Sequence, residues 1–182
     1  MRKCQNMLGA VIIILAAAGP SCAKYPRPPK GSYVRDDANI ITDHYEEKIN
    51  LLCREVEDKT TAQMAVLTIR TFGDKEPWRY AIEIGNRWGV GQADTDNGLV
   101  MVIAVYDRQY FTATGYGMEQ IIPDSTLDTI QKETLVPYFS KTEYGEGILQ
   151  TLQLLAVEIG KFYEDHTQQE IENILNSRVR DE

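Results

Sequence analysis

Cysteine and histidine are scarce in this sequence, and their scarcity argues against several kinds of chemistry. The 182 residues include three cysteines and two histidines. His44 falls in the first turn of an expected helix and His166 in a polar C-terminal segment, so neither resembles a metal-ligand pair or a catalytic base. The sequence also has no P-loop, no G-x-S-x-G elbow and no C-x-x-C pair. A histidine-dependent hydrolase and a dithiol oxidoreductase are therefore not expected.

Positive charge is also in short supply. The sequence contains 19 lysines and arginines and 27 aspartates and glutamates, which gives a formal net charge of −8. A nucleic-acid-binding surface needs clustered cations to neutralise phosphates, so a nucleic acid partner is not expected. The same acidic balance is compatible with binding cations.

The first residues are typical of a bacterial secretory signal. Arg2 and Lys3 precede an apolar run over residues 11–18, which is shorter than the ~20 residues of a membrane-spanning helix. Small residues then lead to Cys22, which predicts a signal peptide over residues 1–21 and lipidation of Cys22. Pro20 is unusual in such a motif, so ordinary secretion with cleavage nearby stays open. The protein is expected in the cell envelope, anchored to a membrane and facing the periplasm or the outside.

The other two cysteines predict no disulfide. Cys4 would leave with the signal peptide and Cys22 would carry the lipid, so Cys53 would remain alone. Cys53 could act as a nucleophile, but it lies on the apolar face of an expected helix. A small buried core residue is the favoured interpretation.

The remaining chain divides into a tether over 22–32, a domain over 33–163 and a polar tail over 164–182 that could form a short helix. Three prolines and a glycine predict that the tether does not pack. Apolar spacing predicts helices over 43–59, 77–88, 124–136 and 144–163. Apolar runs predict strands over 61–70 and 99–105, the second of which forms an antiparallel hairpin with 110–114. These elements predict a single α/β domain with a small mixed sheet.

An acidic loop between glycines precedes the second apolar strand. Asp94, Asp96, Asn97 and Gly98 place several oxygen ligands on backbone that can bend. Hard cations such as Ca²⁺ prefer carboxylate and carbonyl oxygens, so the loop is a candidate cation site. It lacks the pattern of an EF-hand, and from spacing alone a solvated turn is the commoner structure.

Three further acidic residues extend this candidate site. Asp36 lies at the entry to the domain, Glu119 follows a Gly-Tyr-Gly turn, and Asp124 begins an expected helix. Considered singly, Asp36 and Glu119 could be surface charges and Asp124 a helix cap. If catalysis occurs, it would depend on carboxylates and a bound cation that orients a phosphate and lowers the pKa of a water molecule.

Several short motifs in register resemble the TPM domain, the module of thylakoid photosystem-maintenance proteins and of many exported bacterial proteins. In chain order they are Tyr33-Val34-x-Asp36-x-Ala38, Trp88-Gly89-x-Gly91, Asp96-Asn97-Gly98-Leu99, Thr114-Gly115-Tyr116-Gly117-Met118-Glu119, Asp124 and Pro137-x-Phe139. The resemblance covers about residues 33–163. The transmembrane helix and glycine-rich tail that often follow the domain are not found, and a lipid on Cys22 would supply the membrane attachment instead.

The resemblance implies an α/β/α sandwich, divalent-cation binding near the Asp-Asn-Gly loop, and the acid phosphatase activity of plant members. Matched by position, the implied metal ligands are Asp36, Asp96, Asn97, Glu119 and Asp124, with Asp36 and Asp96 as catalytic candidates. Three hypotheses follow: a Ca²⁺-binding envelope protein, a metal-dependent acid phosphatase, and a non-catalytic assembly or maintenance factor that docks an envelope protein complex.

Overall fold

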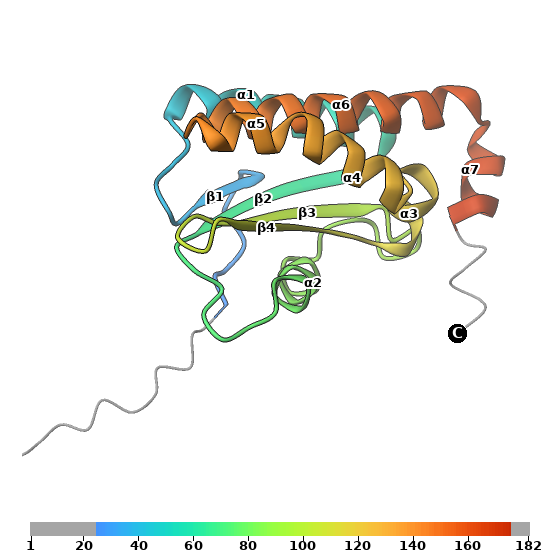
Figure 1. Ribbon diagram of the computed structural model, residues 1–182. Helices are drawn as coiled ribbons and strands as arrows, with labels where there is room; N and C mark the ends of the chain where they lie inside the picture. Colours follow the sequence, from blue (N-terminus) through green and yellow to red (C-terminus); the bar gives the residue numbers. More distant parts are fainter. Residues whose placement is uncertain (1–24, 176–182) are drawn as a thin grey trace, which may run out of the picture.

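The computed structural model describes residues 25–175, which form one mixed four-stranded sheet with helices on both faces (Figure 1). The strands are β1 (Val34–Asp36), β2 (Gln63–Ile69), β3 (Gly98–Ala104) and β4 (Gln109–Thr114), in the spatial order β1-β2-β3-β4. The first three are parallel, and β4 pairs with β3 in the antiparallel direction. The predicted α/β/α sandwich with a small mixed sheet is confirmed. The predicted signal peptide and Cys22 lie outside the described residues.

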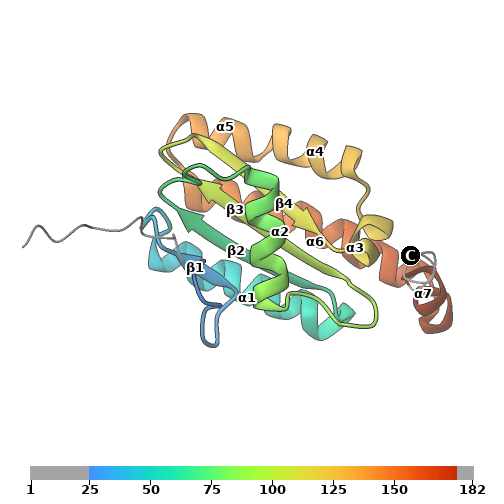
Figure 2. The ribbon, with the colours of Figure 1, turned by 90° about the horizontal axis from the view of Figure 1, so that it is seen from below.

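The two faces of the sheet are covered unequally. One face carries α1 (Asp43–Thr60), α4 (Asp124–Glu133), α5 (Leu135–Ser140) and α6 (Tyr144–Asp165). The other face carries α2 (Pro77–Trp88), which crosses the sheet in Figure 2. Two short helices, α3 (Tyr116–Ile121) and α7 (Gln168–Leu175), lie together at the end of the molecule where β4 finishes.

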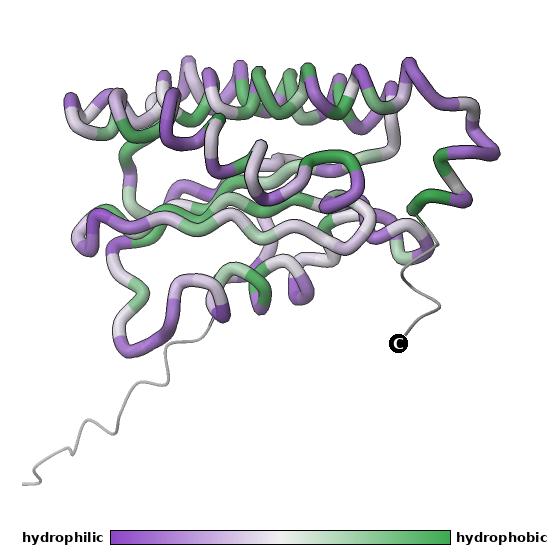
Figure 3. Tube along the Cα trace, turned by 45° about the vertical axis from the view of Figure 1, so that its right-hand side comes forward, coloured by the Kyte–Doolittle hydropathy of each residue, from purple (hydrophilic) through white to green (hydrophobic). Residues whose placement is uncertain are grey.

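The core consists of two apolar layers separated by the sheet, and Figure 3 shows apolar residues along the strands and polar residues in the loops. All seven residues of β3 are buried, because each face of this strand is covered. Leu99, Met101 and Ile103 belong to the cluster that includes α1 and α6, and Val100 and Val102 to the cluster under α2. Cys53 is fully buried in the first cluster, which confirms it as a core residue.

Three elements differ from the sequence prediction. Strand β1 has three residues, too few for an alternating pattern to identify it. The Gly-Tyr-Gly segment is the start of α3, with Gly115 as the N-cap, instead of an irregular turn. Pro137 does not end the helical region: a new helix, α5, begins at Leu135 and contains it. Pro137 is the third residue of α5, where a backbone N–H has no partner within the helix, so its missing donor costs nothing there.

Both ends of the described chain pack against the domain. The ring of Tyr25 lies 5.0 Å from that of Tyr80, and the indole nitrogen of Trp88 donates to the carbonyl of Pro26 at 3.0 Å. The prediction that residues 22–32 do not pack is therefore wrong at Tyr25 and Pro26. Ile171 and Leu175 of α7 are buried in the core, so the folded unit extends past residue 163. No helix within residues 25–175 is both long and apolar enough to cross a membrane.

Candidate functional site

Three glycine-containing segments meet in backbone contact at the start of β3. A Cβ placed on Gly98 would lie 2.1 Å from the carbonyl oxygen of Val90, and one on Gly117 would lie 1.8 Å from that of Thr95. Both distances are far below van der Waals contact, so glycine is needed at each position for the segments to approach. The glycines therefore bring the Asp-Asn-Gly loop against the start of α3.

Asp96 connects this loop to α3 through three hydrogen bonds. Its backbone, with φ of 48°, is in the left-handed region that aspartate tolerates better than most residues. Its carbonyl oxygen accepts from the N–H groups of Gly117 at 3.2 Å and Met118 at 3.3 Å, and its Oδ2 accepts from Tyr116 N at 3.0 Å. Asp96 thus satisfies the N–H groups that the first turn of a helix leaves without partners. Among the described residues, its Oδ1 receives no hydrogen bond.

Asn97 is a fully buried structural link between three elements. Its Oδ1 accepts from Gln92 N at 3.0 Å, and its Nδ2 donates to Thr61 Oγ1 and to the hydroxyl of Tyr163, both at 3.1 Å. These contacts join the loop to the end of α1 and to α6. Both N–H donors of the Asn97 side-chain amide therefore form hydrogen bonds within the protein.

A cavity of about 350 Å³ lies beside the loop, and the carboxylates of Asp96 and Glu119 both line it. Asn86 of α2 and Thr114 of β4 contribute further polar groups. Thr95 Oγ1 in the same loop is buried and has no hydrogen-bond partner within residues 25–175. Asn86 was not predicted, because it lies on α2 and no motif includes it, whereas Thr95 and Thr114 lie within the predicted loop and a quoted motif but were not named as site residues.

Asp36 lies at the opposite end of the sheet. Its carboxylate accepts from the backbone N–H groups of Ile40 at 3.2 Å and Ile41 at 2.8 Å, and from the hydroxyl of Thr68. Asp36 pairs with Thr68 on β2, whereas Gly98 pairs with Gln63. These two positions are five residue steps apart along β2, about 16 Å at ~3.3 Å per step.

The structure therefore brings together Asp96 and Glu119 out of the five predicted ligands. Asp36 is at the other end of the sheet, the Asn97 amide is committed to the fold, and Asp124 is an exposed residue at the start of α4 that does not line the cavity. Within residues 25–175, no three Asp, Glu, His or Cys side chains are grouped closely enough to hold a metal ion by themselves.

The fold and the glycine-packed loop define a class of small α/β/α domains. A model of the TPM domain matches residues 34–158, more than half of the chain, so the chain belongs to the TPM domain family. It is similar to a solution NMR structure of the N-terminal domain of a P. gingivalis protein, with a TM-score of 0.69, 27% identity, and coverage of 76% of this chain and 88% of that one.

One further solved structure agrees with the fold, and two curated proteins are related in sequence. The NMR structure of the BA42 protein of Bizionia argentinensis has a TM-score of 0.60 at 17% identity, and covers 70% of this chain and 90% of that one. A chloroplastic UPF0603 protein of Oryza sativa subsp. indica is 24% identical over 133 residues, 72% of this chain and 44% of the relative, and one of Arabidopsis thaliana is 20% identical. The chain thus spans less than half the length of these curated relatives.

Proposed function

We propose that this chain is an exported, membrane-anchored TPM domain protein of the cell envelope that binds a divalent cation, Ca²⁺ first, in the cavity between α2, β4 and α3. One observation carries the proposal: Asp96 and Glu119, which belong to separate motifs, line one cavity. The export signal and the lipid on Cys22 come from the sequence pattern. The names of the curated relatives, which describe chloroplast proteins, support a protein targeted out of the compartment where it is made.

The donor set fits a cation that is held loosely. Ca²⁺ takes six to eight oxygens from carboxylates, carbonyls and water. Asp96 Oδ1 and the Glu119 carboxylate would supply the charge, and the buried Thr95 hydroxyl shows that the loop contains an oxygen whose bonding the described residues do not complete. A site with two carboxylates and several waters should have one of the lower calcium affinities found in proteins, with a Kd of roughly 10⁻⁴–10⁻³ M as in extracellular modules.

The test is a calcium titration followed by thermal unfolding. A ligand at 100 times its Kd stabilises the folded state by about 2.7 kcal/mol, so Ca²⁺ should raise the Tm of the wild-type protein. Asp96→Asn and Glu119→Gln should remove that rise. Asp94→Asn is the matched control, because Asp94 is an exposed carboxylate of the same loop that does not line the cavity. A rise of equal size in Asp96→Asn, or no rise in the wild type with Ca²⁺ or Mg²⁺, would overturn the proposal.

Acid phosphatase activity is the catalytic extension of this proposal. A bound cation can orient a phosphate and lower the pKa of a water molecule. Because Asp36 is at the other end of the sheet, we place the reaction at Asp96 alone, with Asp36 in a structural role. Cation-dependent hydrolysis of 4-nitrophenyl phosphate should then be lost in Asp96→Asn and kept in Asp36→Asn. Loss in a folded Asp36→Asn variant would move the reaction to the opposite end.

The alternative is a non-catalytic factor that docks an envelope protein complex, and an exposed apolar strip beside α2 favours it. Trp78 and Ile82 on α2, Phe111 on β4 and Tyr116 on α3 are all at least 36% exposed. Trp78 and Phe111 line one hollow, and Ile82 and Tyr116 line the cavity that also contains Asp96 and Glu119. A photo-crosslinker at Phe111 should capture one consistent envelope partner. The same crosslinker at Leu51, an exposed residue on the other face, is the control.

A further inference from the structure

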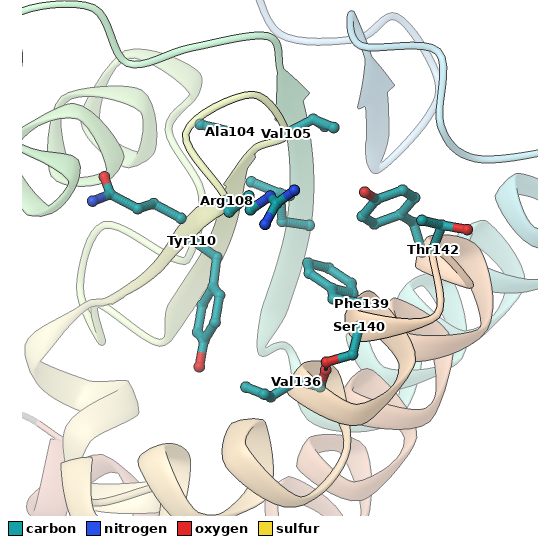
Figure 4. Close-up of a pocket in the computed structure, with 11 residues that line it drawn as sticks. Ala104, Val105, Arg108, Tyr110, Val136, Phe139, Ser140 and Thr142 are labelled. Carbon is teal, nitrogen blue, oxygen red and sulfur yellow. Dashed lines mark hydrogen bonds between the residues drawn. The ribbon is translucent and has the colours of Figure 1, made fainter.

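A second cavity, of about 360 Å³, lies at the opposite end of the sheet from Asp96 (Figure 4). One wall is the turn between β3 and β4, and the other is the region where α5 ends and α6 begins. The cavity is at the carboxyl end of β3, the position where open α/β sheets commonly bind ligands. Its volume is within the range of small-molecule sites.

The cavity wall contains one cation, Arg108. Figure 4 shows its side chain extending from the hairpin turn toward the wall that carries Phe139 and Thr142. Among the described residues, no ion pair or hydrogen bond involves its guanidinium. The adjacent carboxylate of Asp107 accepts instead from Phe72 N at 2.7 Å. Arg108 therefore offers a planar set of donors, which suits a carboxylate or a phosphate.

The backbone on both sides of the cavity is strained. Arg108 has a φ of 53° and Thr142, on the facing wall, a φ of 62°. Glycine, asparagine or aspartate would occupy this left-handed region at lower cost, and for β-branched threonine it is an outlier. Such strain is typical of functional sites, where the side chain is needed in its place.

The rest of the wall combines three aromatic residues, Tyr110, Phe139 and Tyr144, with aliphatic and polar residues. The ring of Phe139 lies 5.0 Å from Tyr144 and 6.4 Å from Tyr110, in edge-to-face arrangements. The Ser140 hydroxyl donates to the carbonyl of Val136 at 2.9 Å, and that of Thr142 donates to the carbonyl of Lys141 at 2.6 Å. Because both hydroxyl hydrogens are used internally, Arg108 supplies the charge recognition and the rings supply apolar contact.

We propose that this cavity binds a small organic anion, with its carboxylate or phosphate group on Arg108 and a flat apolar body against Phe139 and Tyr144. The charge of the ligand is fixed by Arg108, a cation to which residues 25–175 give no ion pair, on an otherwise acidic protein. The shape of the ligand is fixed by the aromatic wall. This site does not depend on the cation site, which lies at the other end of β3.

The test is an NMR titration of the ¹⁵N-labelled protein in EDTA with benzoate, phenyl phosphate and benzyl alcohol. Amide shifts should appear in residues 105–110 and 139–144 with the two anions and be at least tenfold weaker with the neutral alcohol. The anion that binds with the lower Kd, benzoate or phenyl phosphate, identifies the charged group that the site prefers. Saturation should require more ligand at high salt, because the contact is between charges.

Arg108→Gly is the decisive variant, because glycine relieves the left-handed backbone and the protein should fold at least as well. It should weaken anion binding at least tenfold with an unchanged or higher Tm. Lys141→Gln, which removes a nearby exposed cation that does not line the cavity, should bind within twofold of the wild type, as should Asp96→Asn. Equal binding by Arg108→Gly and the wild type, or shifts that map to the Asp96 cavity, would overturn the proposal.

Discussion

The two ends of the sheet differ in the residues that form them and in what those residues contact. At the start of β3, glycines let backbone segments touch, and Asp96 and Asn97 satisfy N–H groups from α3 and the preceding loop. At the carboxyl end, Arg108 has a strained backbone and a guanidinium without a described partner. Most of the motifs by which the family is recognised are at the first end, and much of their content is explained by packing, whereas the motifs that contain Asp36 and Phe139 are at the second end. Arg108, the charged residue of the second cavity, belongs to none of these motifs.

The largest loss of stability is expected at the first end of the sheet, where Gly117 and Thr95 are in the closest backbone contact. Gly117→Ala would place a Cβ 1.8 Å from the carbonyl oxygen of Thr95, and backbone cannot move aside as a flexible side chain can. We expect a loss of about 4 kcal/mol or more in the free energy of unfolding, at the upper end of single-substitution effects. Urea unfolding followed by circular dichroism measures it.

Gly160→Ala is the matched control, because Gly160 lies inside α6 with open space around its Cβ position. There the substitution should stabilise the protein by about 0.5–1 kcal/mol, the difference in helix propensity. A Gly117→Ala variant as stable as the wild type would show that the loop and α3 do not depend on glycine contact, and the contrast between the two ends would fail.

Asn97→Asp distinguishes a structural amide from a cation ligand. Aspartate keeps an acceptor for Gln92 N but loses the donor to Thr61 and Tyr163, and it places a charge in a fully buried position. We expect a loss of about 3 kcal/mol, since an unpaired buried charge costs more than a neutral group. The measurement is urea unfolding with and without Ca²⁺. If the variant gained Ca²⁺ affinity at no cost in stability, Asn97 would belong to the cation site.

Much of the fold was predictable from the sequence because its long elements have regular apolar patterns. β2 and β3 are continuous apolar runs between two covered faces, and α1, α2 and α6 begin at residues 43, 77 and 144, as their apolar spacing predicts. β1 and α3 were not predictable from pattern, since each is too short to show a period. Their positions are determined by tertiary contacts, such as those of Asp96 with the first turn of α3.

The candidate site was predictable in part. Asp96 and Glu119 were expected to meet, and they line one cavity. Asp36 was grouped with them because all three are acidic residues in family motifs, and residue type carries no information about which end of a strand a loop occupies. Strand register decides that question, since Asp36 pairs with Thr68 and the Asp96 loop enters opposite Gln63.

Asp36→Ala measures how strongly the second end depends on the same kind of capping. The substitution removes the acceptor for the N–H groups of Ile40 and Ile41 and for the Thr68 hydroxyl. We expect a loss of about 2 kcal/mol in the free energy of unfolding, with the Ca²⁺-induced rise in Tm retained. Asp37→Ala removes only a solvent-exposed ion pair with Arg35, so it should cost under about 0.5 kcal/mol. Loss of the Ca²⁺ response in Asp36→Ala would mean that the two ends are coupled.

The smallest expected change in stability comes from the core between the two ends. The free energy of unfolding should depend on pH there because Cys53 is buried. Burial raises the pKa of the Cys53 thiol from 9.0 to about 12. Above pH 9 the unfolded chain therefore releases a proton that the folded chain keeps. The raised pKa of the Cys53 thiol stabilises the folded state. This stabilisation is fully present below pH 9, and it decreases as the pH rises toward 12, by at most about 1.4 kcal/mol per pH unit.

Urea unfolding at pH 8, 9 and 10 should therefore show a steeper loss of stability in the wild type than in Cys53→Ala, which lacks the titrating thiol. The comparison between variants is needed because burial also raises the pKa of Tyr80 to about 12, and its hydroxyl titrates in the same direction in both proteins. Iodoacetamide should alkylate Cys53 only as fast as the protein unfolds, since the thiol is fully buried. Parallel pH profiles for the two proteins would contradict the prediction, because they would mean that the Cys53 thiol has the same pKa in the folded and the unfolded chain.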